Sequence, residues 1–162
     1  LLSKTYLLNN DLENSKKALV LAQDAIQNKE NNSKYAFCII GVRISAITLH
    51  YLSGEYKETI EEGMKLLEYH SENSACERIF YSYFFLAFAY YKLGHIEQAL
   101  NWFKKGIFMV LIKDRPYDVY YISGLEVFQE LLNREDLDIC SVNEFKLKYG
   151  NPDEYKEQNM KR

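Results

Sequence analysis

The sequence predicts an all-α fold built from antiparallel helix pairs, and three observations lead to this expectation. Only two prolines and seven glycines occur in 162 residues, which leaves long stretches without a helix breaker. Hydrophobic residues make up 48% and charged residues 27%, as is typical of a folded domain and not of a disordered chain. Turn signals recur at intervals that suit paired helices of about 12 to 19 residues.

Turn and capping residues set the boundaries of the expected helices. Gly54 and Gly94 each follow an apolar segment and end a helix by the usual C-terminal glycine device. Ser74 and Ser141 each stand three residues before a glutamate, the capping-box pattern that begins a helix, and Pro116 suits a first turn. We therefore expect helices at residues 12–28, 34–52, 56–70, 74–93, 96–112, 117–133 and 141–149, in addition to one that is already under way at residue 1.

These helices are expected to form one domain at residues 1–150, followed by a charged tail at residues 151–162. Residues 34–52 are apolar on nearly all sides, which predicts a helix buried all round. Because the chain begins with Leu1 inside a helix, we expect it to be a fragment of a longer protein. We then expect part of the function to reside in a segment outside this chain.

Residues 83–106 carry a specific helix-pair motif. The first helix matches the pattern W-x2-L-G-x2-Y with aromatic and small replacements, and the second matches A-x3-F. The small residues let the two helices approach closely, while the larger ones fill the groove beside them. This segment resembles a tetratricopeptide repeat, which implies antiparallel helix pairs wound into a right-handed superhelix. The matching residues are Tyr83, Leu86, Ala87, Tyr90, Ala99 and Phe103.

Two weaker units precede this one. Gly54 stands 40 residues before Gly94, and Asn10 stands 44 residues before Gly54. Repeats of this length exceed the standard of about 34 residues, so the chain resembles the divergent helical repeats of bacterial peptide-responsive regulators. The places of Ala99 and Phe103 are taken by Thr59 and Gly63 in the middle unit and by Ser15 and Leu19 in the first.

The resemblance to tetratricopeptide repeats implies a concave surface lined by the first helix of each pair, at positions outside the packing motif. An aromatic, poorly charged groove of this kind suits an apolar peptide or an amphipathic helix. The implied positions are Tyr81, Phe84, Phe85, Phe88, Tyr91 and Lys92 on the well-matched unit, Gly41, Ile44, Ser45, Thr48 and Tyr51 on the preceding unit, and, by a looser alignment, Tyr120, Ser123, Val127 and Glu130 on the next helix.

Each of these residues also has a structural interpretation. The aromatic run at residues 81–91 serves equally well as core between neighbouring helices. Arg43 stands on an otherwise apolar helix with Ser45, Thr48 and His50, and together they are candidates for fixing a peptide backbone. A charged residue in such a place is rarely buried without a partner. Pairing of Arg43 with a nearby glutamate, or its exposure to solvent, is therefore the simpler alternative.

The net charge and the absence of known motifs limit the classes of function that the sequence supports. The formal net charge is −3, with lysine and arginine scattered among the acidic residues, whereas nucleic-acid binding needs a basic stripe. No apolar run approaches the roughly 20 residues needed to cross a bilayer, and there is no phosphate loop, dinucleotide fingerprint or nucleophile elbow. We therefore expect no nucleic-acid binding, no membrane span, no cofactor and no catalytic activity.

The histidines and cysteines are too dispersed to form a local metal site. His50, His70 and His95 give no His-x3-His pair, and there is no Cys-x2-Cys pair. Cys38 and Cys76 lie in apolar helical contexts, which indicates buried thiols in a reducing compartment and hence a cytoplasmic location.

The sequence thus favours a tetratricopeptide-like interaction domain that binds a peptide or a protein partner. The irregular repeats, the acidic body and the start within a helix fit the ligand-sensing part of a larger bacterial transcriptional regulator, whose DNA-binding segment would precede Leu1. The alternative is a structural scaffold or homodimerisation domain without a small ligand, in which Tyr117, Tyr120 and Tyr121 or the last helix meet a second copy. An enzyme on a helical platform has no positive support.

Overall fold

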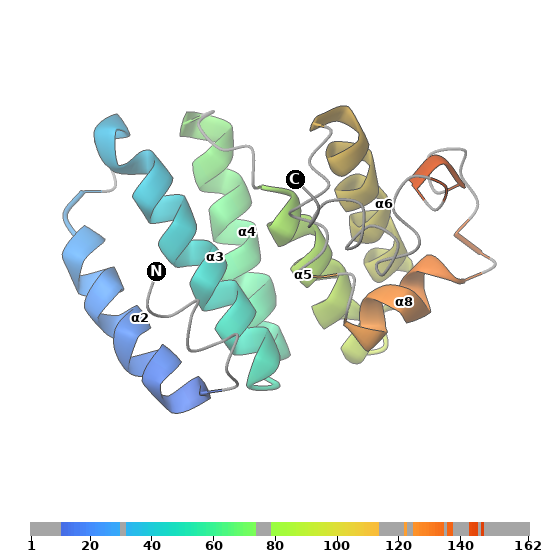
Figure 1. Cartoon of the computed structure of the whole chain (residues 1–162), viewed down its shortest axis with the longest axis horizontal. Coiled ribbons are helices and arrows are strands. Elements are labelled where there is room, and N and C mark those ends of the chain that lie inside the picture. Colours follow the sequence, from blue (N-terminus) through green and yellow to red (C-terminus); the bar gives the residue numbers. More distant parts are fainter. Residues whose placement is uncertain are drawn as a thin grey trace, which may run out of the picture.

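The computed structural model describes residues 11–29, 32–73, 79–113, 122, 125–134, 136, 137, 143–145 and 147. Within these residues the chain is helical and contains no strand, which confirms the all-α class. Helices α2 to α6 stand side by side in chain order, and α8 lies at the far end of the row from α2 (Figure 1). The bounds are α2 Leu12–Ile26, α3 Ala36–Leu52, α4 Tyr56–Asn73, α5 Phe80–Lys92, α6 Ile96–Lys113 and α8 Glu126–Leu132, with a 3-10 turn at Ser33–Tyr35.

Most expected helices are found with small differences at their ends. Helices α2, α3, α4 and α6 correspond to the helices expected from the sequence, and α5 ends one residue before its expected end. The helix expected at residue 1, the starts of both capping boxes, Pro116 and the charged tail lie outside the described residues. Among the helices that the structure does describe, none combines the length and the apolar character that crossing a membrane requires.

The expectation of one continuous helix at residues 117–133 is wrong, because the backbone changes direction at Leu125. This residue has φ −77° and ψ 130°, an extended conformation, and α8 begins only at the next residue, Glu126. The N–H of Leu125 donates to the carbonyl of Ile122 at 3.1 Å, in a turn that precedes α8. Helix α8 is therefore short, and its buried residues are Val127, Phe128, Leu131 and Leu132.

The turns after α3 and after α5 have the same geometry, 40 residues apart. Gly54 and Gly94 have positive φ values of 76° and 81°, a conformation that costs other residues about 1–2 kcal/mol. The N–H of Gly54 donates to the carbonyl of Tyr51 at 3.0 Å, and the N–H of Gly94 donates to that of Tyr91 at 3.0 Å. The expected glycine stops are confirmed, and each lets the next helix return antiparallel beside the one before it (Figure 1).

Positions that the sequence aligns across the three units are buried in each of them. The small position near the start of the second helix is held by Ser15, Thr59 and Ala99, each 0% exposed. The larger position is filled by Leu19 in the first unit and by Phe103 in the third. In the middle unit Gly63 leaves room for Leu86 of α5, whose Cδ2 lies 2.9 Å from where a Cβ on residue 63 would stand.

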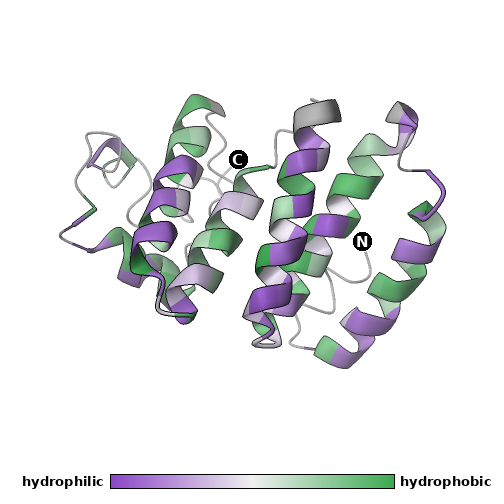
Figure 2. Cartoon of the chain, turned by 180° about the vertical axis from the view of Figure 1, so that it is seen from behind, coloured by the Kyte–Doolittle hydropathy of each residue, from purple (hydrophilic) through white to green (hydrophobic). Residues whose placement is uncertain are grey.

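The core is richest in aromatic residues around α5, which packs against α4 on one side and α6 on the other. Phe80, Phe84 and Phe88 of α5 are each 0% exposed, as is Phe103 of α6, and Phe128 of α8 is 1% exposed. The side of α4 that faces away from this core is mainly hydrophilic, as the view from behind shows (Figure 2). The exposed residues of α4 before Tyr69 are Lys57, Glu58, Glu61, Met64, Lys65 and Glu68.

Helix α2 joins the row through a smaller apolar cluster of its own. Leu19 of α2 packs with Ala46 and Leu49 of α3, separately from the main core, and Ile26 at the end of α2 also packs against the main core. An ion pair of 3.3 Å between Lys16 Nζ and Glu55 Oε1 also connects α2 with the turn after α3. In the described part of the chain, the burial of α2 therefore depends on α3.

Candidate functional site

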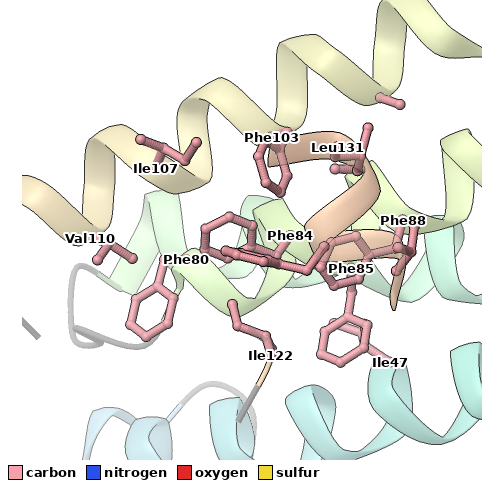
Figure 3. Close-up of a cluster of buried hydrophobic side chains, with 14 of the residues drawn as sticks. Ile47, Phe80, Phe84, Phe85, Phe88, Phe103, Ile107, Val110, Ile122 and Leu131 are labelled. Carbon is pink, nitrogen blue, oxygen red and sulfur yellow. The ribbon is translucent and has the colours of Figure 1, made fainter. Parts of the chain in front are cut away.

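Three aromatic residues that were candidates for a ligand groove belong to the core. Phe84, Phe85 and Phe88 of α5 are 0%, 4% and 0% exposed. The ring centroid of Phe84 lies 5.4 Å from that of Phe103 and 5.5 Å from that of Phe128, and Figure 3 shows Phe84 enclosed among apolar side chains. Phe128 of α8 contacts Phe84 and Phe88, and Phe85 packs against Tyr51 of α3. We therefore assign the three residues to the core and remove them from the candidate site.

Tyr51, at the end of α3, is also a core residue. It is 9% exposed, and its ring centroid lies 5.5 Å from that of Phe85 and 5.7 Å from that of Tyr56. Burial raises the pKa of the Tyr51 hydroxyl well above its ordinary value, because an ionised oxygen would lose its solvation there. We therefore remove Tyr51 from the candidate site as well.

Arg43 pairs with a glutamate, which is one of the two simpler alternatives to ligand binding given in the sequence analysis. Its Nη1 lies 3.3 Å from Glu62 Oε2, and both side chains are about four-fifths buried, with exposed fractions of 18% and 22%. The guanidinium also lies over the ring of Tyr69, 5.9 Å from the centroid. These contacts brace α3 against α4, so Arg43 acts in packing rather than as a group that faces a ligand.

One side of α3 is exposed or partly exposed and carries no charged residue. Helices α2, α4 and α5 cover the rest of α3, with Ala46 and Leu49 against α2 and Ile47 in the main core. The exposed side begins at Phe37, which is 64% exposed, and ends at Leu52, which is 38% exposed. Its members, called here the α3 face, follow the spacing of one side of a helix: Phe37, Cys38, Gly41, Ile44, Ser45, Thr48 and Leu52.

The α3 face corrects two expectations drawn from the sequence. Residues 34–52 are not buried all round, because the helices that the structure describes leave this side exposed or partly exposed. The thiol of Cys38 is exposed, whereas a buried thiol was expected. Cys76 lies outside the described residues.

The α3 face contains four of the positions expected to line a ligand groove and adds three that sequence reasoning missed. Gly41 is exposed, and Ile44, Ser45 and Thr48 are partly exposed. Phe37, Cys38 and Leu52 were not among the predicted positions. Continuing the spacing of three and four residues from Gly41 and Thr48 toward both ends of the helix would have found them.

The two hydroxyl groups of the α3 face are engaged within the helix itself. Ser45 Oγ donates to the carbonyl of Gly41 at 3.0 Å, and Thr48 Oγ1 donates to the carbonyl of Ile44 at 2.8 Å. This is the common bond of serine and threonine to the preceding turn of a helix. Both hydroxyls therefore use their single hydrogen internally.

The other predicted positions are spread along α5 and α8. Tyr81 is partly buried and stacks on Phe80, with 4.6 Å between the ring centroids. Tyr91 is partly buried and Lys92 is exposed, so these two and Tyr81 retain some surface for a ligand. In the looser alignment Val127 is buried and Glu130 exposed, while Tyr120 and Ser123 lie outside the described residues.

A small polar network joins α2 to the end of α3. Glu55 Oε2 accepts a hydrogen bond from His50 Nδ1 at 2.6 Å, and Glu55 Oε1 pairs with Lys16 Nζ. The bond from His50, with a further contribution from Lys16, lowers the pKa of the Glu55 carboxyl below its ordinary value. His50 is thereby committed to Glu55 and not directed toward a ligand.

We expect Glu55→Gln to reduce stability in a pH-dependent way. A lowered carboxyl pKa contributes stability above the ordinary value of 4.5, and that contribution disappears as the pH falls below this value. Because the side chain is 39% exposed, solvent limits the effect to within about 1 kcal/mol. Urea unfolding of both proteins across this pH range measures it, and a difference that persists unchanged into acid would contradict the expectation.

Within the described residues, no group of three histidine, cysteine, aspartate or glutamate side chains gathers in a way that could hold a metal ion.

Comparison with known proteins adds no assignment: no family model matches the sequence, and no curated protein or solved structure is significantly similar to it. The candidate site therefore depends on the geometry of α3 alone.

Proposed function

We propose that this chain is an interaction domain of tetratricopeptide-like helix pairs that binds a peptide or protein partner at the α3 face. The observation that carries the proposal is a helix side with no charged residue, bounded by Phe37 at 64% and Leu52 at 38% exposure. Exposed apolar surface of this kind is typical of places where another molecule binds.

The contrast with α4 supports this interpretation. Five of the exposed residues of α4 are charged, namely Lys57, Glu58, Glu61, Lys65 and Glu68, as is usual for a helix side that only meets water. Helix α3 lies beside α4 in the same row (Figure 1) and has no such residue among the seven of its α3 face. Solvation alone therefore does not account for its composition.

The repeat character of the chain supports the tetratricopeptide-like part of the proposal. The glycine turns at residues 54 and 94 share their hydrogen bonds and positive φ values, and the aligned small positions are buried in all three units. In repeat proteins, each unit contacts its neighbours and the stacked units form an extended concave binding surface. The resemblance to tetratricopeptide repeats implies that the first helix of each pair lines this surface, and the α3 face is the part that we propose for the middle unit.

The test is a capture experiment with a matched pair of variants. Phe37→Asp places a charge on the α3 face, and Phe108→Asp places one at a phenylalanine that is 56% exposed on α6. Both variants and the parent are immobilised and exposed to the same lysate and culture medium, and retained peptides are quantified by mass spectrometry. We expect a set of peptides that the parent and Phe108→Asp retain and Phe37→Asp loses.

Two results would overturn the proposal. If the same molecules remain bound to both variants, the α3 face is not where they bind. If sedimentation instead shows that the parent is a dimer and only Phe37→Asp is a monomer, the chain is a homodimerisation domain.

A further inference from the structure

We infer that the α3 face receives an amphipathic helix, docked by its apolar side, and does not receive an extended peptide. This inference deepens the proposed function and rests on it. It follows from how the polar groups of α3 are used, from the shape of the α3 face and from its lack of charge.

An extended peptide brings unsatisfied backbone groups to its receptor. Each residue other than proline carries one N–H donor and one carbonyl acceptor, and leaving such groups buried without partners costs about 1–3 kcal/mol each. A strand edge could pair with them, but the described residues contain no strand. The side chains of a helix would have to supply the hydrogen bonds.

The polar side chains of α3 are already engaged within the fold. Arg43 pairs with Glu62, and His50 bonds to Glu55. The hydroxyls of Ser45 and Thr48 donate to carbonyls of their own helix. An extended backbone lying on α3 would therefore find acceptors at the hydroxyls but no strong donor on the α3 face, and its carbonyls would be left without partners.

A helix does not have this requirement, because it satisfies its backbone hydrogen bonds internally. It needs an apolar surface with room for close approach between ridges of larger side chains. Gly41 provides that room, since a Cβ built on it would have nothing within 4 Å, and the small residues Ser45 and Thr48 follow it along the helix. Phe37 and Leu52 stand at the two ends as larger side chains.

The lack of charge restricts the chemistry of the docked side. A charged residue of the partner pressed against the α3 face would be desolvated without an opposite charge there, which is strongly unfavourable. The side of the partner helix that makes contact is therefore aliphatic or aromatic, and its charged residues point away. This is the helix-in-groove mode of recognition.

The size of the α3 face favours a single helix over a second copy of the chain. A helix of 17 residues is about 25 Å long, and one side of it presents less than the roughly 800 Å² per partner that a stable dimer buries. Such an area suits reversible binding of one helix. We therefore commit to an amphipathic helix of a partner protein as the occupant.

The experiment uses two peptides of one sequence. Both have 17 residues, the length of α3, with leucine along one side of a helix, glutamate and lysine elsewhere, and no net charge. The first contains only L-residues and can form an amphipathic helix; the second has D-residues at alternating pairs of positions and cannot. Binding of each labelled peptide is followed by fluorescence anisotropy with the full chain and its variants.

We expect the all-L peptide to bind and the D-containing peptide not to. Phe37→Asp should weaken binding of the all-L peptide by roughly tenfold or more, as for the loss of one buried aromatic anchor. Gly41→Leu should also weaken it, since the new side chain blocks close approach while leaving the helix intact. Phe108→Asp adds the same charge elsewhere and should leave binding unchanged.

Other outcomes separate this inference from the proposed function. If both peptides bind equally and both depend on Phe37, the α3 face binds peptides but does not select a helix, and only the inference falls. If neither peptide depends on Phe37, the inference and the proposed function fall together. If the chain forms a dimer through Phe37 that excludes the all-L peptide, the occupant is a second copy and the inference is wrong.

Discussion

We expect Phe84→Ala to lower the free energy of unfolding by about 3–5 kcal/mol. Phe84 is 0% exposed, and its ring meets those of Phe80, Phe88, Phe103 and Phe128 at centroid distances of 5.4 to 6.4 Å. The substitution removes these contacts and leaves a cavity where α5, α6 and α8 converge. Urea unfolding followed by far-UV circular dichroism measures the change.

Phe108→Ala is the matched control for this prediction. Its side chain is 56% exposed on α6, so its removal should change stability by no more than about 0.5 kcal/mol. A loss below about 1 kcal/mol for Phe84→Ala would mean that α8 does not pack against α5 as described. The core assignment of Phe84 would then need to be reversed.

We expect the same substitution at two helical glycines to have effects that differ by about 1–3 kcal/mol. Gly41→Ala and Gly106→Ala both gain the higher helix propensity of alanine, which is about 1 kcal/mol in each case. At Gly41 nothing lies within 4 Å of the new Cβ, whereas at Gly106 it would stand 2.9 Å from Phe84 Cε1. The gain in helix propensity is the same in both variants, so the difference between their free energies of unfolding measures the cost of overpacking at residue 106.

Gly41→Ala should therefore stabilise the chain, and Gly106→Ala should be the less stable of the two variants. The ring of Phe84 has little freedom to move aside, because it is held by Phe103 and Phe128 on two further helices. Thermal unfolding of the two variants side by side gives the difference. Equal stability would show that the space between α5 and α6 is looser than the described contacts require.

Local sequence signals were sufficient for most of the described helices and for the two glycine turns. Glycine at residues 54 and 94 predicted chain reversals because few other residues adopt positive φ at low cost, and both reversals are found. The break at Leu125 was missed although Ser123 and Gly124 precede it, the same pair of residues that stands after α3 at residues 53 and 54.

The candidate site was harder to predict, because two helices looked alike. Residues 34–52 and 80–92 are both apolar on most sides, and periodicity alone does not say which sides neighbours will cover. Phe128 of α8 covers α5 and turns Phe84 and Phe88 into core. No described helix does the same for the α3 face. The predicted setting in a bacterial transcriptional regulator is tested by none of these contacts and stays a prediction.

The separate apolar cluster of α2 gives the row an uneven distribution of local stability. Leu19, Ala46 and Leu49 hold α2 on α3 without sharing side chains with the larger aromatic core. Opening at this end would expose little apolar surface, while opening near α5 would break the whole phenylalanine cluster. Local unfolding should therefore begin at α2, beside α3. The helix that carries the candidate binding face then lies between the least stable and the most stable parts of the described domain.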